Sequence, residues 1–146
     1  MEFQIDLIDE VQSELEDLEQ HLSPLMAHLG RNGGVELVLV SPERIQELNN
    51  LYRGVDKPTD VLSFPIDMPA ADLLGSVVIN IEQAKEEAQK RGHRLLDEVT
   101  LLFLHGYLHL LGYDHESDNG EQRALEEEII QAFNLPPSLI VRTENL

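Results

Sequence analysis

The sequence predicts a single α+β domain with a mixed sheet of about four strands and a buried central helix. The chain has 146 residues, of which 42% are hydrophobic, and this length and composition suit one ordinary domain with its own core. Strand-like and helix-like segments follow one another in the order βαβαββααα, and no repeat or linker-like tract divides them. The segment from 95 to 111 is apolar almost all round, as expected of a buried helix.

The first three elements are predicted from hydrophobic periodicity. Residues 3 to 7 alternate between apolar and polar side chains, as in a short strand. Apolar residues recur at helical spacing from Val11 to Leu29, which predicts a helix that Pro24 kinks or splits. The segment VELVLVS, which follows a pair of glycines, is typical of a buried strand.

The fourth element carries clear signals at both of its ends. Ser41 followed by proline indicates the start of a helix that extends to about Arg53. Gly54 is placed to end this helix. The segment VLSFPI that follows is strand-like.

The second half of the chain is predicted to be one strand and three helices. LLGSVVIN is strand-like, and Asn80 at its end can cap a helix that runs to Gly92. The buried helix from 95 to 111 ends where Gly112 permits a turn, and a last amphipathic helix covers roughly 119 to 133. This order favours a mixed sheet whose edge strand is antiparallel.

The charge of the chain restricts its partners. There are 28 acidic and 10 basic residues, a formal net charge of -18, which argues against general attraction to nucleic acid or to an anionic membrane. Any polyanionic substrate must therefore be held locally.

The N-terminus lacks the features of a signal peptide and the longest apolar run is too short to span a bilayer, so we expect a cytoplasmic protein with no membrane partner. Because the chain has no cysteine, a metal ion must be held by histidine or carboxylate.

Three histidines lie within the segment HGYLHLLGYDH. His105 and His109 are four residues apart on the predicted buried helix, so both lie on one face and can reach one ion. Gly112 permits a left-handed turn through which His115 can approach the same ion. Three imidazoles suit zinc, or a related metal such as nickel, iron or manganese, and they leave a fourth position open to water, which is typical of a catalytic site.

Two other interpretations of these histidines remain open. Each imidazole could be satisfied separately by hydrogen bonds, although burying two of them on one apolar helix face without partners would be costly. A closed structural zinc site would arise if Asp114 or another carboxylate filled the fourth position. Asp114 could equally accept a hydrogen bond from an imidazole and orient it.

The spacing H-x-x-x-H-x-x-G-x-x-H is also that of the metzincin proteases, whose pattern has a glutamate after the first histidine and a methionine turn further on. Here Gly106 stands in the place of the glutamate, and no methionine follows Met68. A zinc metallopeptidase is a weaker alternative because the usual general base is missing. Gly106 itself either allows close packing or leaves room beside the metal for a bulky ligand.

The motif HGYLHLLGYDH, with the upstream segment LYRGVDKPTDVLSFP and the strand LLGSVVIN, resembles the YbeY family of bacterial metal-dependent endoribonucleases, which mature ribosomal RNA. The resemblance covers most of the chain and implies one zincin-like hydrolase domain over residues 1–146. It also implies a functional arginine at Arg53, single-stranded RNA as substrate and the small ribosomal subunit as the setting. The implied ligands of the zinc ion are His105, His109 and His115.

The chemistry of these residues is compatible with an endoribonuclease. Zinc lowers the pKa of a bound water to about 7 and stabilises charge that develops on a phosphodiester. Arg53 can bind phosphate through two parallel hydrogen bonds, with Lys57 nearby as a point charge, although its spacing alone favours a cation that complements the helix dipole. One departure from the family is Ser76, which stands where an acidic residue is usual.

An alternative from another class is a ribosome-assembly factor whose zinc only holds the last helix in place. The strongly acidic composition argues against avid binding of naked RNA and favours docking on basic ribosomal proteins. The acidic run from 116 to 128 is either such a docking face or, more simply, a solvated helix face.

Overall fold

The computed structural model describes residues 3–30, 33–66 and 73–137, and its elements follow the predicted order. The helices and strands are β1 (Phe3–Asp9), α1 (Leu18–Leu29), β2 (Gly33–Val40), α2 (Pro42–Arg53), β3 (Val61–Pro65), β4 (Leu73–Asn80), α3 (Ile81–Arg91), α4 (Leu95–Leu110) and α5 (Glu121–Phe133). None of these helices is long and apolar enough to cross a membrane.

The four strands form one mixed sheet in the order β1-β2-β4-β3. β2 pairs in parallel with both β1 and β4, whereas β3 pairs with β4 in the antiparallel direction. The structure therefore confirms the predicted α+β class, the mixed sheet and its antiparallel edge. The sheet order also places β3, which follows α2 in sequence, at the edge beyond β4.

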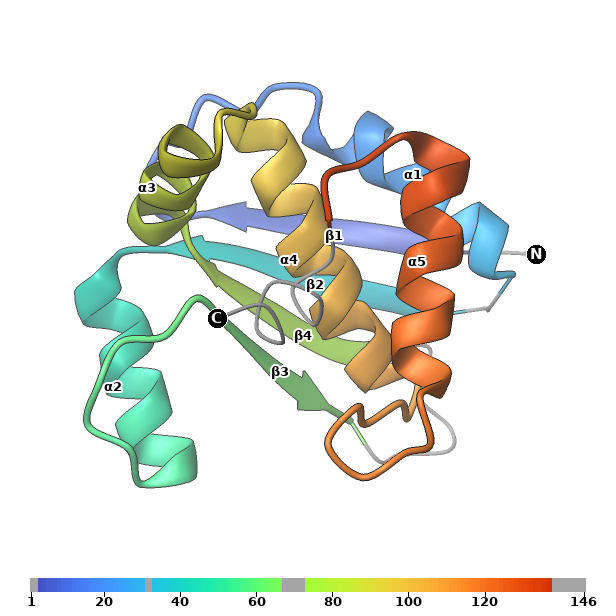
Figure 1. The fold of residues 1–146 in the computed structure, drawn as a ribbon. Coiled ribbons are helices and arrows are strands. Elements are labelled where there is room, and N and C mark those ends of the chain that lie inside the picture. Colours follow the sequence, from blue (N-terminus) through green and yellow to red (C-terminus); the bar gives the residue numbers. More distant parts are fainter. Residues whose placement is uncertain (1–2, 31–32, 67–72, 138–146) are drawn as a thin grey trace.

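The two faces of the sheet are covered unequally. Figure 1 shows α1, α4 and α5 over one face, with α4 running across its middle. Because successive side chains of a strand point to opposite faces, Val35 and Leu37 of β2 pack into the large core under these helices. Val38 and Val40 point the other way and form a smaller core with Ile45 of α2.

The end signals of α2 act as the sequence predicts. The Ser41 hydroxyl accepts a hydrogen bond from the backbone N–H of Arg44 at 3.2 Å, and Gly54 adopts a left-handed conformation with φ 71°. The helix thus stops at Arg53, and this fixes the place from which the Arg53 side chain projects.

The predicted start of the first helix is wrong, because α1 begins at Leu18 and not at Val11. Gln12 and Glu14 both have positive φ, at 50° and 65°, which a right-handed helix does not allow. The Asp9 carboxylate accepts hydrogen bonds from two backbone N–H groups of this segment and offers it an alternative to helical bonding. Val11 nevertheless packs against the core, which explains why its spacing resembled that of a helix.

Two smaller differences concern helix interiors and ends. Pro24 lies inside α1, which continues through it to Leu29 and is not split. The last helix begins at Glu121, slightly later than predicted, because Gly120 has φ 100° and cannot be part of it. Neither difference moves an element that carries a predicted site residue.

The buried central helix is α4, and Gly106 lies where it approaches the sheet. A Cβ atom at this position would lie 2.8 Å from Cγ1 of Val77 and 3.0 Å from Oγ of Ser63. The Ser63 hydroxyl also donates a hydrogen bond to the Gly106 carbonyl at 3.1 Å. Of the two interpretations of this glycine, the structure favours close packing of α4 on β3 and β4.

We expect Gly106→Ala to lower the free energy of unfolding by about 1–2 kcal/mol. Alanine is intrinsically the better helix former, but its methyl group would press on Val77 and Ser63 and push α4 away from the sheet. Urea unfolding of the two proteins measures the difference. A variant as stable as the wild type, or more stable, would contradict this account of the packing.

Candidate metal centre

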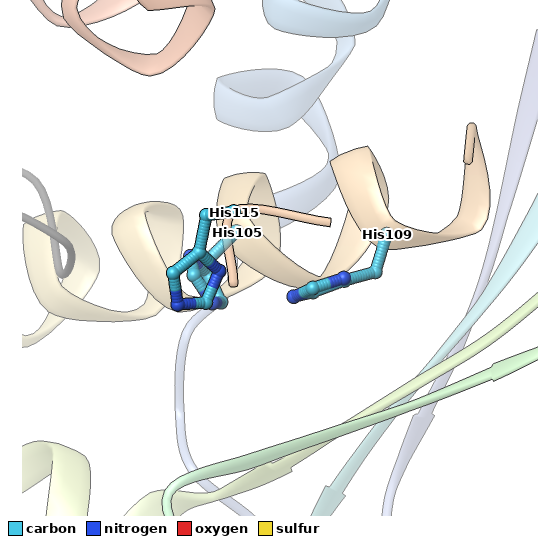
Figure 2. Close-up of side chains that lie close together, drawn as sticks. All are labelled: His105, His109 and His115. Atoms are coloured by element: carbon cyan, nitrogen blue, oxygen red, sulfur yellow. The ribbon is translucent and has the colours of Figure 1, made fainter. Parts of the chain in front are cut away.

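The last turns of α4 and the loop after it bring three histidines together. His105 and His109 lie one turn apart on the helix, and their ring centroids are 5.0 Å apart. Gly112, with φ 101°, reverses the chain so that the ring of His115 lies 5.0 Å from that of His105 and 5.7 Å from that of His109. Each histidine offers one ligand atom, and these three atoms lie within 4.8 Å of one another. Figure 2 shows the His109 ring pointing toward the rings of His105 and His115.

Two features of these rings fit a divalent metal ion. Burial, together with the neighbouring His105 and His115, holds the pKa of His109 below its ordinary value, so this imidazole stays neutral and keeps a lone pair for a metal. The Nδ1 atom of His115 is buried and, within the described part of the chain, has no hydrogen-bond partner. A metal ion shared by three neutral imidazoles satisfies such atoms, so this cluster could hold one.

The histidines open onto a cleft of about 640 Å³ that also contains Arg53. Arg53 reaches this cleft from the C-terminal end of α2, far from the histidines in sequence. Lys57 is exposed in the loop after α2 and is not among the described residues that line the cleft. The fold therefore brings Arg53, but not Lys57, into the same cavity as the three histidines.

Asp114 also lines the cleft, but its carboxylate serves the turn that carries His115. It accepts a hydrogen bond from the backbone N–H of Glu116 at 3.1 Å. This bond and one from the Ser117 side chain lower the pKa of Asp114 below its ordinary value. None of the hydrogen bonds among the described residues joins Asp114 to an imidazole, so its predicted role in orienting a histidine stays a prediction.

A different carboxylate, which the sequence interpretation missed, contacts the cluster. Glu126 of α5 is buried, and its Oε2 lies 3.1 Å from Nδ1 of His105. Gln122, one turn earlier and also buried, accepts a hydrogen bond from the backbone N–H of His115 at 2.9 Å. The interpretation of the run from 116 to 128 as a solvated or docking face is therefore wrong for these two residues.

Helical periodicity was the available signal for these two residues. Gln122, Glu126, Ile129 and Phe133 are spaced at four, three and four residues, so they share one stripe of a helix. The two apolar members pack in the core, and the polar members on the same stripe must be buried with them. The surrounding acidic residues conceal this stripe when the segment is judged by composition alone.

Similarity to known proteins decides the family of the chain. The family model described as Endoribonuclease YbeY matches residues 4–134. The chain belongs to the YbeY family. Endoribonuclease YbeY of Nautilia profundicola is 60% identical over 111 residues, which cover 76% of this chain and 80% of the relative.

Two further comparisons extend over nearly the whole chain. Endoribonuclease YbeY of a Nitratiruptor species is 48% identical over 143 residues, which cover 97% of this chain and 88% of the relative. The solution structure of a Thermotoga maritima protein is similar with a TM-score of 0.60 and 30% identity, and the match covers 91% of this chain and 92% of that one. These matches confirm the resemblance that the histidine motif indicates.

Membership of the YbeY family makes the chain a hydrolase that acts on RNA. It is consistent with a function in the maturation of ribosomal RNA. The histidine cluster fits the metal dependence expected from the sequence.

Proposed function

We propose that the protein is a zinc-dependent endoribonuclease that cuts single-stranded RNA during ribosomal RNA maturation, at the small ribosomal subunit in the cytoplasm. We further propose a single hydrolase domain with one zinc ion per chain, whose ligands are His105, His109 and His115. The observation that carries this proposal is that the three imidazoles open onto the cleft that contains Arg53. Family membership supports RNA as the substrate.

The histidines and the basic residues have different roles in this proposal. When bound, zinc supplies Lewis acidity and an activated water molecule at neutral pH. Because an imidazole ligand carries no net charge, the three histidines would hold the ion without reducing its positive charge. Arg53, from a different element, can bind two oxygens of a phosphate and neutralise charge that develops on it, while Lys57 adds a positive charge for the strand outside the cleft.

The acidic lining makes the metal necessary for substrate binding as well. Asp60, Asp114 and Glu116 line the cleft together with Arg53, so the protein side chains alone present more negative than positive charge. A phosphodiester would be repelled by such a lining. A divalent ion at the histidines reverses this balance close to the place where the substrate must lie.

The non-catalytic alternative also has an observation in its favour. The contact between Glu126 and His105 ties α5 to the histidine cluster, so a metal there would also hold the last helix in place. A zinc ion with that single function would make the protein an assembly factor that binds the ribosome, through its basic proteins, without cutting RNA. Loss of the metal would abolish RNA cleavage if the protein is an enzyme, and ribosome association if it is an assembly factor.

Changing His109 to Ala separates the two functions. We expect His109→Ala to lose cleavage of single-stranded RNA while its association with small ribosomal subunits is largely kept, because the variant removes a metal ligand in the cleft and leaves the rest of the surface unchanged. Cleavage of a labelled RNA, co-sedimentation with subunits and thermal unfolding are measured on one preparation. His21→Ala, a histidine of α1 outside the cluster, is the matched control.

The opposite pattern would favour the assembly factor. In that case the wild type would cut no RNA with any divalent metal, and His109→Ala would lose ribosome association together with thermal stability.

A further inference from the structure

Glu126 is placed unusually for a carboxylate, because it is only 1% exposed at the inner face of α5. A buried carboxylate is costly unless hydrogen bonds or a nearby positive charge compensate it. Its Oε2 atom lies 3.1 Å from Nδ1 of His105 and 3.0 Å from Nε2 of Gln122. Both of its described partners thus belong to, or contact, the histidine cluster.

The contact with Glu126 decides which nitrogen of His105 is available to a metal. Nδ1 of His105 lies 3.1 Å from Oε2 of Glu126 and 3.5 Å from Nε2 of Gln122. A carboxylate oxygen only accepts hydrogen bonds, so the shorter contact favours the tautomer in which Nδ1 of His105 donates and carries the proton. Nε2 then keeps its lone pair and is the atom left for the site that His105 shares with His109 and His115. Histidine ligands that donate their second N–H to a carboxylate are held in one ring orientation and bind metals more strongly.

Gln122 connects the third histidine to the same carboxylate. Its side chain is fully buried, with Oε1 accepting the backbone N–H of His115 at 2.9 Å and Nε2 donating to Glu126 at 3.0 Å. These two contacts use the acceptor end and the donor end of one amide. The loop that carries His115 is therefore tied to the group that orients His105.

We propose that Glu126 is a positioning residue of the metal centre, which fixes the tautomer and ring orientation of His105, and that Gln122 couples the His115 loop to it. This inference rests on the proposed function, since it takes the three histidines as metal ligands. It makes α5 part of the metal centre and deepens the assignment of that site.

The first test measures zinc affinity in Glu126→Gln, which keeps the size of the side chain and removes its charge. We expect zinc to bind about 10-fold to 100-fold more weakly than to the wild type, in competition with a chromogenic chelator. Gln122→Met should weaken binding less, because Glu126 and its contact with His105 remain. The matched control is Glu127→Gln, whose carboxylate contacts Arg123 at 3.3 Å and should not affect zinc affinity.

A second test has two parts, and the first of them needs only the wild type. Long-range ¹H–¹⁵N spectra of the zinc-loaded wild type should show the His105 proton on Nδ1. The melting temperature of metal-free Glu126→Gln should stay close to that of the metal-free wild type, which a merely structural role of Glu126 would not allow.

The proposal would be overturned by wild-type zinc affinity in Glu126→Gln, or by a His105 proton on Nε2. Failure of the wild type itself to bind zinc would instead refute the metal centre, and with it the proposed function. The two failures are therefore distinguishable.

Discussion

Removing the metal ion should lower the rate of RNA cleavage by at least roughly a thousandfold. Among the described residues that line the cleft, Arg53 is then opposed by three acidic side chains, Asp60, Asp114 and Glu116, so the lining stabilises negative charge on a phosphodiester poorly. The measurement is cleavage of a labelled single-stranded RNA by protein dialysed against a chelator. One equivalent of zinc per chain should restore the activity.

The metal-free protein must be shown to be folded for this result to count. The larger core joins α1, α4 and the sheet through apolar side chains, so we expect the circular dichroism spectrum to be retained. The melting temperature should fall, because an ion that binds only the folded state stabilises it. Any RNA cleavage by the His109→Ala protein, purified in parallel, measures the background from contaminating ribonuclease. Undiminished cleavage by the metal-free protein above that background would refute metal dependence.

The fold was predictable from the sequence where local signals agree with the tertiary structure. Ser41 and Gly54 determine the two ends of α2 through their own backbone and side-chain geometry, so no distant contact was needed to find them. The start of α1 was not predictable in this way. Gln12 and Glu14 adopt positive φ although neither is a glycine, and the core that accepts Val11 is built mostly from residues far along the chain.

The residues of the candidate site also differ in whether local sequence signals were enough to predict them. The three histidines lie within one helix and the turn that ends it, so their spacing alone brings them to one point. Arg53 carries no local signal for the cleft, because its position depends on where the sheet order places the end of α2. Glu126 was missed for another reason: its burial follows from the stripe that it shares with Ile129, and its acidic neighbours obscure that stripe.

Arg53→Ala should lower kcat/KM for RNA cleavage by about 10²- to 10³-fold while zinc content and thermal stability are unchanged. The side chain is exposed, so little packing is lost, but it lies in the same cleft as the histidines. There its guanidinium can pair with two phosphate oxygens at once. If it stabilises charge only in the transition state, kcat falls; if it binds the ground state equally, KM rises.

Two further variants decide what Arg53 contributes. Arg53→Lys keeps the charge and loses the planar fork, so recovery of only part of the activity would indicate bidentate binding of phosphate. Arg44→Ala removes another arginine of α2, which pairs with Glu47 at 3.1 Å and does not line the cleft, and it should cut RNA like the wild type. If Arg53 only complements the dipole of α2, Arg53→Ala would instead lose up to about 1 kcal/mol of stability and keep full cleavage. That result would show that Arg53, although it lines the cleft, does not take part in cleavage.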